Sequence, residues 1–287
     1  VALRAAFVAT MAGYQVALVT PTTLLARQHG HLFEERFKGF PITVDTLSRM
    51  TKPKQAAMIK SGLKDGSVQM VVGTHALLAQ SIEFNNLGLL IIDEEQHFGV
   101  GQKERLKELR GDIHVLTLSA TPIPRTLALS LHGDLDVSQI DELPPGRTPI
   151  RTTLLNSSQR EKAHQLIRSE VELGQRAYVV LPLVEESEKL ALRSAVDVHA
   201  ELADEVFPDL NVGLLHGRLS SAEKQSVLSD FADGRSQVLV STTVVEVGVD
   251  VPEASVMVIE HAERFGLAQL HQLRGRVGRG AAASHCV

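Results

Sequence analysis

Short apolar runs alternate with segments of helical periodicity along the chain. Clear examples of the runs are residues 16–19, 68–72, 89–92 and 238–241. A strand made almost entirely of apolar residues is buried on both faces, which is typical of parallel sheets, and parallel strands are usually joined by helices. The alternation therefore predicts an α/β protein with mainly parallel sheets and helices on both faces. It also predicts a charged helix over 102–110, a buried strand over 113–118, and further strands over 135–140 and from 284 to the end of the chain. Ser158 with Glu161, and Ser220 with Glu223, have the spacing of capping boxes and so predict two helix starts.

The segment 141–152 interrupts this alternation. It contains Pro144, Pro145, Gly146 and Pro149, which cannot sustain a helix and make a poor central strand. We interpret it as a linker, with one domain over 1–146 and a second over 147–287. The 287 residues suffice for two domains of ordinary size, and clefts between domains are favoured ligand sites.

Composition narrows the class of protein. The net charge is −5, so no global basic field points to nucleic acid, although a local basic groove remains compatible with that charge. Cys286 is the one cysteine, which rules out an intramolecular disulfide. No apolar run approaches the roughly 18 residues of a membrane helix, and no signal peptide begins the chain. We expect a cytoplasmic protein without a membrane partner.

An acidic cluster follows one of the apolar runs. Residues 89–92 lead directly into Asp93, Glu94 and Glu95. Crowded carboxylates repel one another, so they are easiest to explain if they face a cation or transfer a proton. Open α/β sheets bind ligands at the carboxyl ends of their strands. The alternative is that Asp93 and Glu94 only cap the next helix.

Small hydroxyl residues follow several other predicted strands, as at Thr22, Thr74-His75 and Ser119 to Thr121 in the first half. Arg218, Thr242-Thr243 and 246–250 occupy equivalent places in the second half. Hydroxyls and helix N-termini offer donors suited to phosphates, so together these groups indicate a polyanion. Taken singly, each is more simply a helix cap.

A basic, glycine-rich stretch covers residues 272–280. Arg276 and Arg279 lie three apart among glycines, which allows close approach to a phosphate chain by forked donors of fixed charge. The alternative is a solvated basic turn.

These stretches together carry a family resemblance. Residues 93–96, 119–121 and 272–279 resemble the ordered motifs of superfamily-two helicases. The chain is most similar to the group of double-stranded DNA motors that contains RecG and the transcription-repair coupling factors, with 116–126 and 265–279 fitting both. Residues 43–110 lean towards the coupling factors, and the chain from about 133 leans towards RecG. A natural intermediate and a chimera both remain open.

The resemblance implies a fold and a chemistry. The fold would be two RecA-like domains, the first lacking its initial strand and phosphate loop and the second ending early. The ligands would be ATP and Mg²⁺. Asp93 would hold the metal, Glu94 would activate the attacking water, and Arg276 and Arg279 would act as arginine fingers on the γ-phosphate. The implied nucleotide-binding residues are Asp93, Glu94, Gln272, Gly248 and Asp250.

The resemblance also implies DNA contacts and coupling residues. The DNA-binding residues would be Thr22, Arg27, Thr74, His75, Arg218 and Thr243. The coupling residues would be Gln96, Ser119 and Thr121. The partner would be duplex or branched DNA, with RNA polymerase added if the protein works as a coupling factor. The implied role is an ATP-dependent helicase or translocase in DNA repair and recombination.

Two departures from the family pattern are visible. Gln96 and His97 stand where the family usually has His and Arg, which puts a role for Gln96 in sensing hydrolysis in doubt. No Gly-x-x-x-x-Gly-Lys-Ser/Thr phosphate loop occurs in the sequence, so we expect the chain by itself to be inactive. The alternatives are a nucleic-acid-binding module that does not hydrolyse ATP, and an unrelated small-molecule α/β enzyme, on which DNA would have no effect.

Overall fold

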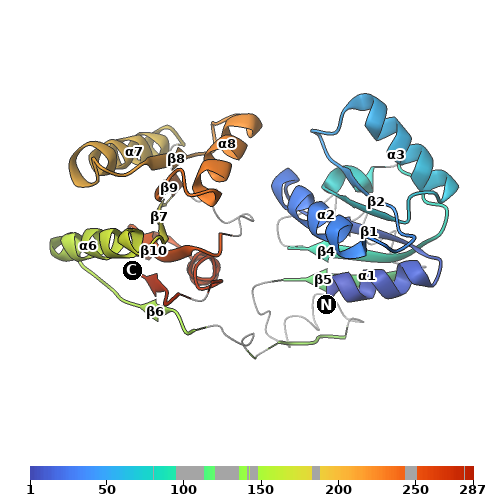
Figure 1. Cartoon of the computed structure of the whole chain (residues 1–287), viewed down its shortest axis with the longest axis horizontal. Coiled ribbons are helices and arrows are strands. Elements are labelled where there is room, and N and C mark those ends of the chain that lie inside the picture. The colour runs from blue at the N-terminus through green and yellow to red at the C-terminus, as the bar shows by residue number, and fades with distance from the viewer. Residues whose placement is uncertain are drawn as a thin grey trace. The chain divides into compact units, whose positions relative to one another are not determined.

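The computed structural model describes residues 1–79, 81–94, 113–119, 136–140, 142, 148–182, 188–242, 251–280 and 282–287. The chain forms two compact units, residues 1–120 and 121–287, each described by itself below (Figure 1). The helix predicted over 102–110 lies outside the described residues. The strand predicted over 135–140 is wrong for its described part, because 136–140 is exposed and has no regular structure.

Unit 1 is built on a five-stranded sheet with the order β2-β3-β1-β4-β5. Every pairing between neighbouring strands is parallel, as the apolar runs predicted. The strands are β1 (Gln15–Val19), β2 (Val44–Leu47), β3 (Met70–Gly73), β4 (Leu87–Asp93) and β5 (His114–Leu118). Because all run in one direction, their carboxyl ends share one end of the sheet. β5 is only half-buried, whereas the sequence predicted a buried strand there.

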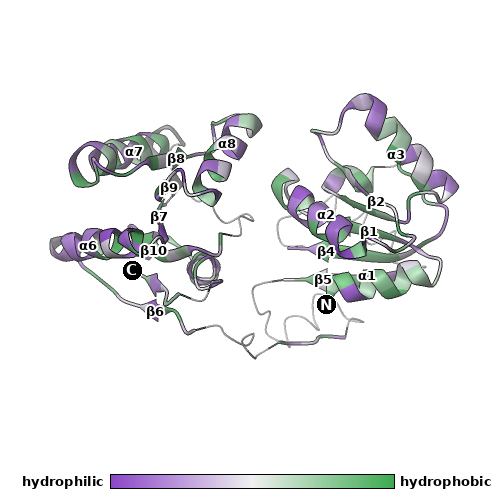
Figure 2. Ribbon diagram, viewed as in Figure 1, coloured by the Kyte–Doolittle hydropathy of each residue, from purple (hydrophilic) through white to green (hydrophobic). Residues whose placement is uncertain are grey.

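Helices cover both faces of this sheet: α1 (Ala2–Met11), α2 (Thr23–Phe37) and α3 (Pro53–Asp65), with a 3-10 turn η1 (His75–Leu78). Alternate residues of the central strands point to opposite faces. Val16 and Ile91 join one core cluster with Phe33 of α2, whereas Ala17 and Ile92 belong to the cluster on the other face. Figure 2 shows the strands as apolar ribbons between helices of mixed polarity. The sheet is therefore buried on both sides.

Unit 2 contains a six-stranded parallel sheet with the order β6-β11-β10-β7-β9-β8. The strands are β6 (Arg151–Thr152), β7 (Arg176–Leu181), β8 (Val212–Leu215), β9 (Val238–Thr242), β10 (Ala254–Ile259) and β11 (His285–Cys286). The short β11 confirms the strand expected at the end of the chain. It lies between β10 and β6 and so connects β6 to the main sheet.

The helices of unit 2 also pack on both faces of its sheet. They are α6 (Arg160–Glu172), α7 (Glu188–Ala200), α8 (Ser221–Ala232) and α9 (Leu267–Arg274), with turns η3 (Ser157–Gln159), η4 (Glu201–Val206) and η6 (Ala262–Arg264). Ile167 of α6 joins the core cluster that includes Val179 of β7 and Val240 of β9. On the other face, the buried ring of Tyr178 packs against Phe231 of α8, with their centroids 4.7 Å apart.

Helix starts were predicted with mixed success. Thr22 caps α2, its Oγ1 accepting from the Leu25 N–H at 3.4 Å, and Ser220 and Glu223 form the predicted capping box of α8. The box predicted at Ser158 and Glu161 is wrong. Asn156 and Gln159 form it instead, at the start of η3, because a 3-10 turn precedes α6 and moves the cap towards the N-terminus.

No helix among the described residues is long and apolar enough to cross a membrane.

Candidate functional site

The acidic cluster lies at the carboxyl end of the unit 1 sheet. Asp93 is the last residue of β4, and Glu94 follows it with φ = 54°, a left-handed conformation that is uncommon for a residue other than glycine. The Glu94 N–H donates to the carbonyl of Leu118, the last residue of β5, at 3.0 Å. Both acidic side chains are half-buried. β4 thus presents two adjacent carboxylates where parallel sheets bind ligands.

His29 of α2 holds the Asp93 carboxylate. Its Nε2 lies 2.9 Å from Asp93 Oδ2. The second oxygen of the Asp93 carboxylate can still accept a hydrogen bond. Asp93 could therefore hold Mg²⁺ through a water molecule while it is bound to His29. Mg²⁺ needs few protein ligands when phosphates supply others. Among the described residues, no group of three or more His, Cys, Asp and Glu side chains that could hold a metal ion occurs.

Predicted phosphate-binding groups surround these acids at the same end of the sheet. Thr22 begins α2 directly after β1, with Arg27 exposed one turn further along the helix. Thr74 follows β3 and is buried, whereas His75 is exposed. Ser119 follows β5. The structure therefore brings every described site residue predicted in the first half to one end of one sheet.

The carboxyl end of the unit 2 sheet carries a second polar group. His216 and Arg218 follow β8, and Thr242 ends β9, the neighbouring strand. Arg218 is exposed, His216 is half-buried and Thr242 is buried. Burial lowers the pKa of His216, and the charges of Lys224 and Arg218 lower it further. Lys224 Nζ donates to the carbonyl of Gly217 at 2.7 Å, which fixes the turn that presents Arg218.

Unsatisfied polar atoms gather at these two sheet ends. Within the described chain, the buried side-chain atoms that lack a hydrogen-bond partner include Thr74 Oγ1, Thr117 Oγ1, His216 Nδ1 and Thr242 Oγ1. Thr74, His216 and Thr242 lie at strand ends, and Thr117 is one residue from the end of β5. A buried polar group without a partner costs about 1–3 kcal/mol, so each calls for an explanation such as a bound ligand or water.

The arginine-rich loop lies at the opposite end of the unit 2 sheet. It follows α9, which carries the half-buried Gln272. Gly278 has φ = 76°, and a Cβ there would lie 2.9 Å from Ile150 Cγ1, just before β6. A Cβ on Gly280 would overlap the carbonyl oxygen of Pro252, just before β10. The loop that carries Arg276 and Arg279 thus packs against the amino ends of these strands.

The two arginine groups of unit 2 are therefore separated by the length of the sheet. Arg218 lies at the carboxyl ends, and Arg276 and Arg279 lie near the amino ends. A strand of six residues spans roughly 20 Å, so these groups cannot bind the same phosphate. The separation fits the different roles that the resemblance implied for them. Arg276 and Arg279 are half-buried, and Arg279 Nε donates to the carbonyl of Gly275 at 3.3 Å.

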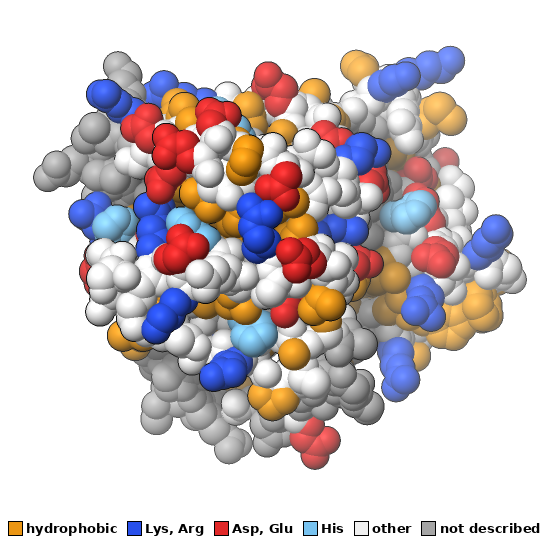
Figure 3. Space-filling view, turned by 60° about the vertical axis from the view of Figure 1, so that its left-hand side comes forward, with side chains coloured by type: hydrophobic (Ala, Val, Ile, Leu, Met, Phe, Trp, Pro, Cys, Tyr) orange, Lys and Arg blue, Asp and Glu red, His pale blue; other side chains and the backbone are white. Residues whose placement is uncertain are grey.

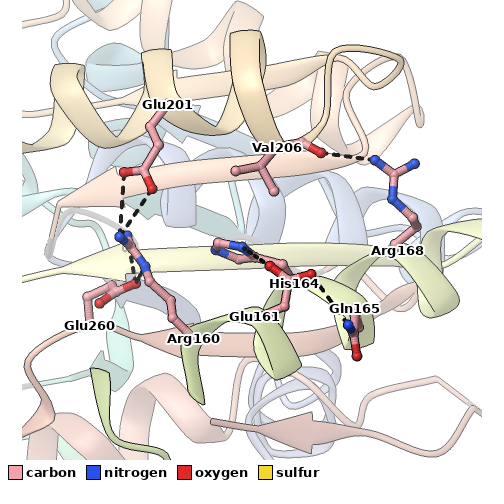
Figure 4. Close-up of polar contacts among 8 residues, drawn as sticks. All are labelled: Arg160, Glu161, His164, Gln165, Arg168, Glu201, Val206 and Glu260. Carbon is pink, nitrogen blue, oxygen red and sulfur yellow. Dashed lines mark hydrogen bonds and ion pairs between the residues drawn. The ribbon is translucent and has the colours of Figure 1, made fainter. Parts of the chain in front are cut away.

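An ion-pair network anchors the segment that leads from β10 to this loop (Figure 4). Arg160, the first residue of α6, donates to Glu260 at 3.1 Å and to Glu201 at 3.3 Å. Glu260 follows β10, and Glu201 begins the π-helical turn η4. Burial, followed by the charge of Arg160, lowers the pKa of His164 on the next turn of α6. The network joins two helices to the end of a central strand.

The surface of unit 2 shows no single-sign charge field in the view of Figure 3, where acidic and basic side chains alternate among hydrophobic ones. This agrees with the net charge of −5. Binding of a polyanion to this face would therefore depend on local basic groups.

Five predicted site residues lie outside the described residues: Gln96, Thr121, Thr243, Gly248 and Asp250. Sequence reasoning missed His29 and His216. His29 is a mid-helix residue whose partner lies 64 positions away, so no local pattern marks it. The sequence His216-Gly217-Arg218 directly follows a predicted strand. This position led us to propose Arg218 as a site residue, but it did not single out His216.

Comparisons with known proteins agree with this arrangement. Residues 1–129 match the DEAD/DEAH box helicase family model, and residues 158–281 match the model of the helicase conserved C-terminal domain. The chain is 50% identical over 287 residues to the ATP-dependent DNA helicase RecG of Synechocystis sp., covering 100% of this chain and 34% of that one. It is 49% identical over 295 residues to RecG of Escherichia coli K12, covering 100% and 42%.

Solved structures give the same result. A RecG structure bound to a three-way DNA junction superposes with a TM-score of 0.80 at 46% identity, covering 99% of this chain and 37% of that one. Yeast Dbp5 bound to RNA and ADP BeF3 matches with a TM-score of 0.65 at 17% identity, covering 95% of this chain and 70% of that one. At that identity the likeness shows the fold alone. The two units therefore form a RecA-like helicase core, as predicted.

The match to RecG runs through both halves of the chain, so the RecG resemblance predicted for the second half extends to the first. The chain spans 34% to 42% of the length of these two relatives. Family models, relatives and fold all agree, and the chain belongs to the RecG group of superfamily-two helicases.

Proposed function

We propose that this chain is the motor core of an ATP-dependent DNA helicase that remodels branched DNA in repair and recombination. One observation carries the proposal: paired carboxylates and unsatisfied hydroxyls meet at one end of the unit 1 sheet, in a chain about half identical to RecG helicases. Binding of a three-way junction by a RecG relative supports branched DNA as the substrate. RNA polymerase would be a further partner only if the protein worked as a transcription-repair coupling factor.

The chemistry follows from the two acids. Bound Mg²⁺ would neutralise charge on the nucleotide phosphates. Asp93 would hold the metal, and Glu94 would orient the attacking water and accept its proton. The left-handed backbone of Glu94, which carries a hydrogen bond to Leu118, supports a functional role for this residue, because such conformations are concentrated at functional sites. Gln272, Arg276 and Arg279, together with Gly248 and Asp250, would bind and stabilise the phosphates.

DNA contacts are assigned to the hydroxyl and basic groups at the carboxyl ends of both sheets. Thr22, Arg27, Thr74 and His75 would serve in unit 1, and Arg218 and Thr243 in unit 2. Thr74 directly follows β3 at this end of the sheet, which supports its assignment. Ser119, Thr121 and Gln96 would couple the nucleotide state to DNA movement. Since its substrate is DNA and its relatives are bacterial, we place the protein in the cytoplasm.

The test is ATP hydrolysis by the full-length protein, with and without three-way junction DNA. We expect turnover that the junction stimulates, and loss of that turnover in the Glu94→Gln variant. DNA binding without turnover would instead favour the alternative of a non-hydrolysing nucleic-acid-binding module. Absence of any response to DNA would contradict both proposals. The 287-residue chain should be measured in parallel, since it contains no phosphate-loop sequence.

A further inference from the structure

His29 links two functions that the sequence treats separately. It lies on α2, the helix that begins directly after the proposed DNA contact Thr22. Its Nε2 lies 2.9 Å from Oδ2 of Asp93, the proposed metal ligand. An ionised carboxylate only accepts hydrogen bonds, so the imidazole is the donor. The side chains are 26% and 18% exposed, so the contact is largely shielded from water.

We propose that His29 is a positioning residue that orients the Asp93 carboxylate for its metal and ties it to the DNA-contacting helix. The inference rests on the proposed function and adds a residue to it. Carboxylates that bind metals are usually held by an outer hydrogen bond, and loss of such a partner typically costs 10–100-fold in metal affinity. His29 is the partner that the structure gives to Asp93.

Helix α2 is well suited to transmit movement to this contact. Ala26 and Phe33 are buried in the core on either side of His29. Gly30 packs so closely on the sheet that an added Cβ would overlap Thr46 Oγ1. The backbone that carries His29 is therefore held firmly within a packed helix. Thr22 lies seven residues from His29, or about 10 Å along the helix axis.

The consequence is a mechanical connection between DNA and the metal site. A phosphate that binds at Thr22 and displaces the start of α2 would shift His29 and hence the Asp93 carboxylate. DNA binding and metal binding would then be thermodynamically linked through one rigid helix. This link is distinct from the catalytic roles of Asp93 and Glu94, because His29 acts only through another residue.

The test compares His29→Leu, which keeps volume but removes the donor, with His29→Gln, which keeps an N–H donor. His31→Leu is the matched control, because His31 is exposed on the same helix. Full-length proteins are titrated with Mn²⁺ in the presence of ADP, with and without three-way junction DNA, and bound metal is followed by electron paramagnetic resonance. Thermal unfolding checks that each variant is folded. If His29→Leu does not fold, the comparison is made with His29→Gln.

We expect His29→Leu to weaken Mn²⁺ binding by about tenfold or more, His29→Gln to restore most of it, and His31→Leu to match the wild type. DNA should shift the Mn²⁺ affinity of the wild type and His31→Leu, but not that of His29→Leu. The inference would be overturned if His29→Leu and His31→Leu bound Mn²⁺ equally well. It would also be overturned if DNA changed the Mn²⁺ affinity of these two variants by the same factor. If the wild type hydrolyses ATP normally, only the His29 inference then fails. If the wild type neither binds Mn²⁺ with ADP nor hydrolyses ATP, the proposed function fails.

Discussion

The backbone N–H of Glu94 donates to the carbonyl oxygen of Leu118 at 3.0 Å. This bond belongs to the last pair of the β4–β5 ladder, Asp93 with Leu118. Glu94 itself has a left-handed conformation, with φ = 54°. Backbone strain of this kind costs of order 1–3 kcal/mol and is concentrated at functional sites. The bond also links the acidic cluster to Ser119, the next residue after Leu118.

Replacement of Glu94 by glutamine tests its role as the base. An amide cannot accept the proton but keeps the size of the side chain and the backbone bond to Leu118. In the full-length protein we expect ATP turnover to fall by about 10²–10⁴-fold, with unchanged affinities for ATP and DNA. Glu83→Gln is the control, because Glu83 is exposed and pairs with Lys64. Retained hydrolysis in Glu94→Gln would remove Glu94 from the base role.

Replacement of Arg279 by alanine tests the proposed arginine finger. A group that acts in the transition state contributes to rate more than to ground-state binding. We expect kcat to fall by about 10³-fold, with a much smaller change in nucleotide affinity measured by titration. Arg193→Ala, at an exposed position on α7, should leave both unchanged. Equal losses of rate and affinity in Arg279→Ala would argue against a finger.

Gly280 tests whether the packing of the arginine loop matters. In Gly280→Ala the new Cβ would overlap the carbonyl oxygen of Pro252, so the loop must shift. We expect the free energy of unfolding to fall by about 1–3 kcal/mol in urea titrations. Hydrolysis by the full-length protein should also decrease. Gly217→Ala is the matched control for stability, because a Cβ there meets nothing within 4 Å. Equal stability of the two variants would contradict the observed packing.

The ion-pair network of unit 2 should stabilise the fold modestly. Arg160→Ala leaves Glu201 and Glu260 without their shared cation. All three side chains are partly exposed, so we expect a loss of only about 1 kcal/mol. A double-mutant cycle with Glu260→Gln, followed by urea unfolding, measures the coupling directly. Strictly additive effects would mean that the contact contributes nothing.

Asp209 predicts a pH dependence of stability. Both carboxylate oxygens accept from Arg168, at 2.9 and 3.1 Å, and these bonds lower the pKa of Asp209 below its ordinary value. Since the folded-state pKa is the lower one, the contribution is complete above the unfolded pKa of about 3.9 and is lost as pH falls through the folded value. Asp209→Asn should therefore be less stable than the wild type at neutral pH. The difference in melting temperature should shrink as the pH falls below 4, and a constant difference would refute this account.

The elements of the fold could be predicted because their signals are local. Continuous apolar runs such as 89–92 specify strands buried on both faces, and the Ser220 and Glu223 pair specifies a helix start. The same local reasoning was wrong at Ser158, where a 3-10 turn displaced the cap, and at 136–140, which joined no sheet. Both errors concern short segments, in which the backbone depends on the elements that flank it.

The site could be predicted only in part. Asp93, Glu94, Thr74 and Ser119 were proposed as site residues because they lie at the ends of predicted strands, and parallel strands bring their carboxyl ends together. His29 could not be found in this way, because its partner is brought near by the packing of α2 on the sheet. The separation of Arg218 from Arg279 was equally invisible in the sequence. It depends on α9 carrying the chain back to the amino ends of β10 and β6.

The sequence by itself determined which residues carry charge, hydroxyl groups and backbone freedom, and in what order they follow the strands. These are properties of single residues and short spacings, and they sufficed for the fold class and the family resemblance. Only the tertiary structure decided which of these groups meet. The His29–Asp93 contact, the Arg160 network and the unsatisfied hydroxyls at the sheet ends arise from strand order and helix packing. These depend on the burial of apolar surface summed over each whole unit, which no local stretch of sequence encodes.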